Sequence, residues 1–165
     1  MTFKPTLREK VVVIDDVATT QTWAKFALES AGYDVFASSN HPSAFLLLER
    51  EQPRLVLLDA SDLATTGARL VRDIKDSAPR AVVVLHSARS AYDLSEMARD
   101  MRADGFIRKG WDQETMLGLA RAYLDGDRPG LSSDTRRPPA RSDRPSGKVY
   151  CPPPVGLGGP HRRSA

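Results

Sequence analysis

The sequence predicts an α/β protein in which a doubly wound, five-stranded parallel sheet is flanked by five helices. Short apolar runs alternate with longer segments whose apolar residues recur every three to four positions. The runs at residues 11–14, 55–58 and 81–85 are continuously apolar, as expected of strands buried on both faces of a parallel sheet. None of these runs approaches the roughly 20 residues that span a bilayer. These observations predict one α/β domain and exclude a membrane-spanning protein.

The predicted strands cover residues 10–16, 33–37, 54–59, 81–86 and 105–109. In the second of them, apolar and polar residues alternate from Tyr33 to Ala37, which is typical of a strand nearer the edge of a sheet. The third follows Pro53 and ends in the carboxylate of Asp59, so its last side chain is expected at the carboxyl edge of the sheet.

The predicted helices cover residues 19–32, a segment that begins after Asn40, and residues 65–77, 91–102 and 112–124. Gly32 is expected to end the first helix, and Asn40 to cap the second, whose first turn contains Pro42. The buried face of the first helix is predicted to hold five residues at helical spacing: Trp23, Ala24, Ala27, Leu28 and Ala31.

The domain is expected to end near residue 125. Residues 126–165 hold 8 of the 12 prolines and 6 of the 11 glycines, so we predict a disordered Pro/Gly/Arg-rich tail. That tail carries a net charge of +5 and residues 1–125 one of −2, so the overall charge of +3 does not indicate a basic surface on the domain. The scattered arginines could contact nucleic acid or an anionic surface, but no tight cluster or aromatic platform favours it.

Two further observations bound the location and the chemistry. The single cysteine, Cys151, excludes a disulfide framework and a cysteine-rich zinc site. The first ten residues have no apolar segment of the kind found in signal peptides, so we expect a cytoplasmic protein.

Polar side chains follow the central strands: Asp15, Asp16, Asp59, Ser87 and Lys109. Because the carboxyl ends of parallel strands meet at one edge of a sheet, we expect these side chains to lie close together. Three adjacent carboxylates repel one another unless a cation relieves them, and Mg²⁺ prefers such oxygen ligands. A lysine and a hydroxyl would complete a phosphoryl-binding site, and an aspartate can itself attack phosphorus. The pattern predicts phosphoryl transfer with magnesium.

These residues, in this order, resemble the receiver domain of two-component response regulators, and in particular the single-domain chemotaxis regulator, over about residues 8–125. The likeness rests on five features: Asp15-Asp16, Asp59, Gly67, Ser87-Ala88 and residues 105–109. The resemblance implies a flavodoxin-like sheet with strand order 2-1-3-4-5 and a stand-alone receiver without an output domain.

The resemblance also implies a role for each site residue. Asp59 would accept a phosphoryl group from a sensor histidine kinase or a phosphotransfer protein. Asp15, Asp16, Asp59 and the backbone carbonyl of Ser61 would hold Mg²⁺, and Lys109 would pair with the phosphoryl group. Ser87 would move to hydrogen-bond that group, and Phe106 would be the aromatic switch that follows it.

The output would be phosphorylation-dependent contact between the surface at about residues 90–124 and an unknown downstream protein. We do not expect an enzyme beyond self-phosphorylation from donors and slow self-dephosphorylation.

Three positions depart from the family pattern. Gly110 replaces the usual proline after the lysine, Asp62 and Leu63 replace the common Met-Pro, and Arg89 occupies a variable position. The first two favour an alternative, a pseudo-receiver that binds its partner without phosphorylation.

Simpler roles are open for the individual residues. Asp15 or Asp16 could cap the following helix, Ser87 could be an N-cap or a turn residue, Lys109 could be solvated, and Phe106 could be plain core. His86 is expected to be structural, because neighbouring strand residues point to opposite faces and cannot share a proton.

Overall fold

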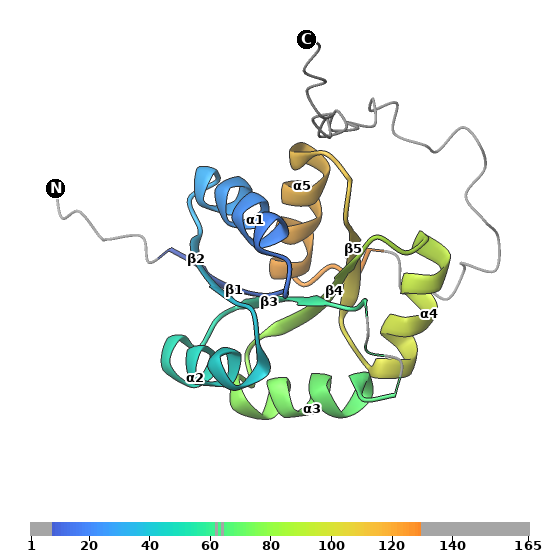
Figure 1. Ribbon diagram of the computed structural model, residues 1–165. Coiled ribbons are helices and arrows are strands. Elements are labelled where there is room, and N and C mark those ends of the chain that lie inside the picture. Colours follow the sequence, from blue (N-terminus) through green and yellow to red (C-terminus); the bar gives the residue numbers. More distant parts are fainter. Residues whose placement is uncertain (1–7, 62, 64, 130–165) are drawn as a thin grey trace, which may run out of the picture.

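The computed structural model describes residues 8–61, 63 and 65–129 (Figure 1). Strands and helices alternate throughout, in the order β1 (Lys10–Ile14), α1 (Ala18–Ser30), β2 (Asp34–Ser38), α2 (His41–Glu51), β3 (Leu55–Asp59), α3 (Gly67–Ser77), β4 (Val82–Ser87), α4 (Ala91–Met101), β5 (Gly105–Arg108) and α5 (Gln113–Leu124). The strand order is β2-β1-β3-β4-β5, and every neighbouring pair is parallel. The predicted fold class, strand order and edge position of β2 are confirmed.

Helices cover both faces of the sheet. Figure 1 shows α1 and α5 on one face and α2, α3 and α4 on the other. Each face has its own core, and successive residues of β3 alternate between them: Leu55 and Leu57 pack with α1 and α5, Val56 and Leu58 with the opposite helices. A strand buried on both faces has no polar side to alternate with, which explains the continuous apolar runs in the sequence.

The helix ends confirm the predicted caps. Asn40 precedes α2, and its side chain accepts a hydrogen bond from the Ser43 amide at 2.9 Å. Gly32 follows α1 with a φ of 91°, a left-handed conformation that favours glycine just past a helix end. Gly67 begins α3, where a side chain would collide with Met101 of α4.

The predicted burial of Trp23 and Ala31 in α1 is wrong. Trp23 is 37% exposed and Ala31 is also exposed, whereas Ala24, Ala27 and Leu28 are fully buried. Those three side chains belong to the core that α1 shares with the sheet. Trp23 lies about 100° around the helix from Ala24, on the solvent side. The sequence spacing fitted two adjacent stripes, and only the stripe of Ala24, Ala27 and Leu28 belongs to the core.

The amino-terminal end of β5 carries a buried polar network. Asp104 is 7% exposed and accepts a hydrogen bond from the Val83 amide at 2.9 Å. Its carboxylate also pairs with Lys75 at 3.0 Å and with Arg128 at 3.1 Å. Every oxygen of this buried carboxylate therefore has a partner, as buried charges require.

The side chain of Tyr123, in α5, is hydrogen-bonded to the backbone of β5. Its hydroxyl accepts a hydrogen bond from the Phe106 amide at 3.0 Å and lies 2.8 Å from the Pro129 carbonyl oxygen. Burial raises the pKa of Tyr123 to about 12. A side chain at position 105 would collide with the Tyr123 ring, so Gly105 is required for this approach.

Of the predicted disordered tail, residues 130–165 lie outside the described residues. Within the described ranges, no helix combines the length and apolarity that crossing a membrane demands.

Candidate functional site

The predicted site residues meet at the carboxyl edge of the sheet. Asp15 follows β1, Asp59 ends β3, and Ser87 ends β4. The loop after β5 is tied to β4 by a hydrogen bond from the Lys109 amide to the Ser87 carbonyl at 2.8 Å. This bond fixes the backbone of Lys109 beside the neighbouring strand ends. Parallel topology thus joins residues that lie up to ninety-four positions apart in the sequence.

Lys109 links two of the carboxylates directly. Its Nζ lies 2.8 Å from Asp59 Oδ1 and 2.7 Å from Asp15 Oδ2, and the side chain is 17% exposed. Burial alone would lower the pKa of Lys109, but hydrogen bonding and charge attraction from Asp15 and Asp59 outweigh it and raise that pKa above its ordinary value. Lys109 is therefore a fixed positive charge at the centre of the site.

The three carboxylates form a cluster that suits a divalent cation. Oxygen atoms of Asp15, Asp16 and Asp59 all lie within 4.8 Å of one another. They line a cavity of about 340 Å³, together with residues that include Leu63 and Thr66. Asp15 Oδ1 accepts a hydrogen bond from the Val17 amide at 2.9 Å. The buried Oδ2 of Asp15 forms an ion pair with Lys109 Nζ and has no other hydrogen-bond partner among the described residues.

Hard oxygen donors with an under-used buried oxygen are what Mg²⁺ binding requires, so the donor set fits this ion.

The two oxygens of Asp59 differ in their surroundings. Oδ1 accepts hydrogen bonds from Lys109 Nζ and from Ser61 Oγ, both at 2.8 Å, and from the Ser61 amide at 3.3 Å. No described residue donates a hydrogen bond to Oδ2. The carboxylate is therefore held in one orientation through Oδ1 and keeps Oδ2 available for a ligand or a reaction.

Arg89 bridges the two loops above Asp59, which the sequence did not predict. Its Nη2 donates to the Ser61 carbonyl at 3.3 Å, and its own carbonyl accepts from Arg108 Nε at 3.1 Å. The carbonyl assigned to the metal by resemblance thus already has a cationic partner. Its role as a metal ligand stays a prediction.

Neither Ser87 nor Phe106 forms a hydrogen bond with Asp59 in the described part of the chain. Ser87 is 2% exposed, and among the described residues its Oγ has one hydrogen bond, a long one of 3.5 Å from the Arg89 amide. The N-cap of α4 is Ser90, so the alternative that Ser87 caps this helix is wrong. Phe106 is buried, with its ring centroid 6.4 Å from that of Trp111. Their proposed movements stay predictions.

Two further expectations concern Gly110, which follows Lys109, and the helix-capping role considered for Asp15 or Asp16. Gly110 has a φ of 88°, which favours glycine, and Lys109 reaches Asp59 with this residue in the usual place of proline. The residue that caps α1 is Val17, with no side-chain cap, so neither Asp15 nor Asp16 caps that helix. Asp62 lies outside the described residues.

His86 is a buried polar residue on the strand next to Asp59, and the sequence does not explain why a histidine is buried there. It pairs with Asp59 in the sheet register and is 1% exposed. Neither ring nitrogen has a hydrogen-bond partner among the described residues. Burial, and then the Lys109 charge, lower its pKa to about 4 against the opposing charge of Asp59. The imidazole is therefore neutral at physiological pH.

Comparison with known proteins gives one family. The family model described as "Response regulator receiver domain" matches residues 11–121. A response regulator from Thermotoga maritima is 28% identical, with a TM-score of 0.66 over 72% of this chain and 99% of that one.

A chemotaxis protein of Vibrio cholerae is 17% identical, with a TM-score of 0.61 over 69% and 97% of the two chains. A Burkholderia pseudomallei response regulator, solved with a phosphorylated aspartic acid, calcium ion and citrate, is 21% identical, with a TM-score of 0.60 over 72% and 69%. At these two identities the likeness concerns the fold alone.

Proposed function

The chain belongs to the response regulator receiver domain family, and on this premise we propose that it is a stand-alone switch that is phosphorylated on Asp59. The observation that carries the proposal is the asymmetry of the Asp59 carboxylate. Oδ1 is fixed by Lys109 and Ser61, while Oδ2 is left without a described donor beside Asp15 and Asp16. A nucleophile needs such a fixed orientation with one free lone pair.

The reaction transfers a phosphoryl group from a histidine of a sensor kinase or a phosphotransfer protein. The N–P bond breaks as Asp59 Oδ2 forms the O–P bond, and the leaving imidazole keeps the electron pair. Lys109, already 2.8 Å from Asp59, offsets the added negative charge. Catalysis of this kind depends mainly on positioning and charge neutralisation, which the cluster supplies. Slow hydrolysis of the acyl phosphate would return Asp59 to its free state.

Mg²⁺ is the cofactor that the donor set fits, with Asp15, Asp16, Asp59 and the Ser61 carbonyl as the proposed ligands. When bound, it would neutralise charge on the phosphoryl oxygens. The Burkholderia pseudomallei regulator was solved with a phosphorylated aspartic acid and a calcium ion, which supports a role for both a divalent ion and a phosphorylated aspartate in this fold. Lys109 would then exchange its contact with Asp15 for one with the phosphoryl group.

The response would begin at Ser87. Its hydroxyl makes only the long 3.5 Å contact with the Arg89 amide, so little is lost when it turns to a phosphoryl oxygen. Phe106, packed against Trp111, would follow that movement. A downstream protein would then bind the altered surface at about residues 90–124. A local charge change thereby biases an element with two arrangements.

A second candidate is the pseudo-receiver, which binds a partner without phosphorylation. The observation that favours it is the pair of cations already in the site. Lys109 contacts both Asp15 and Asp59, and Arg89 holds the Ser61 carbonyl, so the acidic cluster is partly neutralised without a metal ion.

Intact-mass spectrometry separates the two candidates. After incubation with Mg²⁺ and acetyl phosphate, the wild-type chain should gain about 80 Da, the mass of one phosphoryl group. Asp59→Asn should gain nothing, and Asp73→Asn, at a partly exposed carboxylate on α3, should behave as wild type. An unmodified wild-type chain would contradict the switch and favour the pseudo-receiver.

A further inference from the structure

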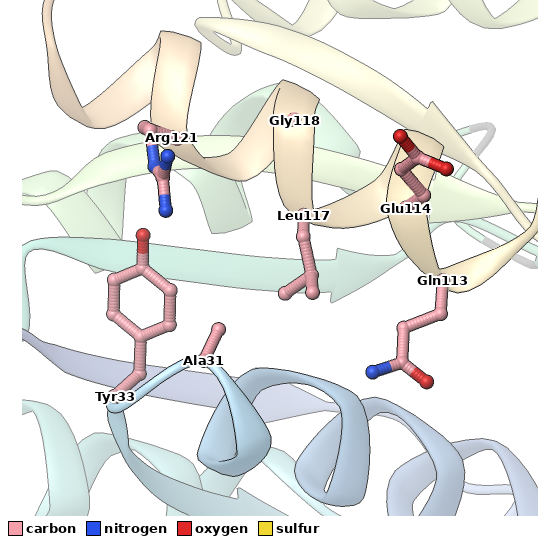
Figure 2. A pocket seen from close by; sticks show the side chains of 7 residues that line it. All are labelled: Ala31, Tyr33, Gln113, Glu114, Leu117, Gly118 and Arg121. Carbon is pink, nitrogen blue, oxygen red and sulfur yellow. The ribbon is translucent and has the colours of Figure 1, made fainter.

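A groove lies between the end of α1 and the exposed side of α5, away from the acidic cluster. Its volume is about 470 Å³. Figure 2 shows its seven lining residues, with the Arg121 guanidinium directed towards the Tyr33 ring at one end and Gln113 and Glu114 at the other. Gln113 Nε2 donates to Ser30 Oγ at 3.0 Å, which joins the two helices at that end. The groove is thus a formed feature with an apolar middle and charged ends.

Gly118 is unexplained by the packing of this domain. It lies in the middle of α5 on the exposed side, where glycine weakens a helix relative to alanine. A Cβ atom built there would meet no described atom within 4 Å. Its φ is not in the left-handed region either, unlike that of Gly110. A small residue on an exposed helix face lets the backbone of another helix approach closely.

Two opposite charges flank this position at equal spacing. Glu114 and Arg121 are seven residues apart in α5. The midpoint between these two charges falls between Leu117 and Gly118. Residues seven apart share one helix face. Both charged side chains are exposed, and neither takes part in an ion pair with another described residue. The stripe Glu114–Leu117–Gly118–Arg121 is consequently self-complementary when a second α5 is laid beside it antiparallel.

We propose that this groove binds a second copy of the chain through an antiparallel α5–α5 pair. A two-fold axis near Leu117 and Gly118 places Glu114 opposite Arg121 of the partner subunit, and Arg121 opposite Glu114 of the partner subunit. Leu117 then covers Gly118 of the partner subunit, where the absent side chain leaves room. Such an isologous contact forms two equivalent ion pairs, one for each charge, and closes at two subunits. The pairing does not depend on phosphorylation of Asp59.

Charge reversal tests this pairing sharply, with sedimentation equilibrium of the full chain as the measurement. At about 100 µM protein, where weak transient interfaces are populated, wild type should be dimeric in large part. Glu114→Arg and Arg121→Glu should each be monomeric, because each places like charges opposite one another. An equimolar mixture of these two variants should recover the dimer, since one subunit then offers two arginines and the other two glutamates.

The double variant Glu114→Arg/Arg121→Glu should also dimerise. Gly118→Leu should weaken the dimer at least tenfold by filling the space for Leu117.

Glu49→Arg makes the same charge change on the exposed side of α2, and it should dimerise as wild type does. Circular dichroism of each variant checks that the fold is retained, as expected at exposed positions. A monomeric wild-type chain would overturn the proposal and assign the groove to a different partner. Single reversals that dimerise unchanged, or a mixture that fails to recover the dimer, would equally overturn it.

Discussion

Two buried aspartates at opposite ends of the same sheet have opposite uses. Asp104, at the amino end of β5, receives the Val83 amide and two cations, so both of its oxygens are satisfied within the fold. Asp15, at the carboxyl end of β1, has an Oδ2 whose one partner among the described residues is Lys109, and no described residue donates a hydrogen bond to Oδ2 of nearby Asp59. The residues at the two edges of the sheet are of the same type and similarly buried. Among these described residues, only the carboxylates at the carboxyl edge keep an oxygen that can accept a further bond.

This difference separates structural from functional carboxylates. A buried charge that the fold satisfies completely contributes to stability and has nothing left for a ligand. A cluster held together by one lysine is less well satisfied, and it gains when a divalent cation or a phosphoryl group arrives. The two ends of the sheet should therefore respond differently to mutation, and the predictions below run from the largest effect to the smallest.

The largest effect is expected from His86, the buried imidazole beside Asp59. Its pKa falls from 6.5 to about 4 in the folded chain, so between these pH values the unfolded chain binds a proton that the folded chain does not. Its contribution to stability is complete above pH 6.5 and is lost as the pH falls through about 4, a change of about 3 kcal/mol.

Urea unfolding at a series of pH values should show that His86→Leu, similar in size, lacks this acid decline. An unchanged pH dependence would show that His86 is not the buried group responsible.

Removal of the Asp104 carboxylate should lower the free energy of unfolding by about 2 kcal/mol. Asp104→Ala leaves the buried Val83 amide without an acceptor, while the partly exposed cations Lys75 and Arg128 add little. Asp59→Asn should change stability by less than about 1 kcal/mol, because asparagine still accepts from Ser61 and Lys109. Chemical denaturation measures both. If Asp59→Asn destabilises the chain more than Asp104→Ala does, the distinction between a structural Asp104 and a functional Asp59 is contradicted.

Arg89→Ala should tighten Mg²⁺ binding by a factor of about two to ten, because the Ser61 carbonyl is released from its hydrogen bond with the guanidinium. Isothermal titration calorimetry gives the affinity. Arg108→Ala removes a neighbouring positive charge without freeing that carbonyl, so it should have a smaller effect. Equal gains in the two variants would indicate general electrostatics rather than competition for the carbonyl.

Much of the fold follows from local patterns. Continuous apolar strands required helices on both faces, and the strand-end residues Asp15, Asp59 and Lys109 had to share one edge once the sheet was parallel. The contacts that the sequence did not predict are long-range and geometric. The bond from Arg89 to the Ser61 carbonyl depends on how two loops face each other, and the Tyr123 clamp on Phe106 depends on the register of α5 against β5.

Trp23 shows a different limit of sequence reasoning. Helical spacing placed it on a stripe with Ala27, but the residues of α1 buried against the sheet are Ala24, Ala27 and Leu28. The helical period shows which residues lie near one another around α1. It does not show how much of the helix circumference is buried against the sheet. The lack of hydrogen-bond partners for the His86 ring among the described residues was also not predicted. A histidine within an apolar strand does not indicate, from the sequence, whether its ring nitrogens are hydrogen-bonded.

The central claim is that unused bonding capacity marks Asp59, and not Asp104, as the reactive carboxylate. Peptide mapping by mass spectrometry after incubation with acetyl phosphate and Mg²⁺ tests it most directly. We predict one phosphoryl group, on the peptide that contains Asp59, with none on the peptide that contains Asp104 and none anywhere when Mg²⁺ is removed by EDTA. A phosphoryl group located on any other residue, or none on Asp59 with Mg²⁺ present, would contradict the account.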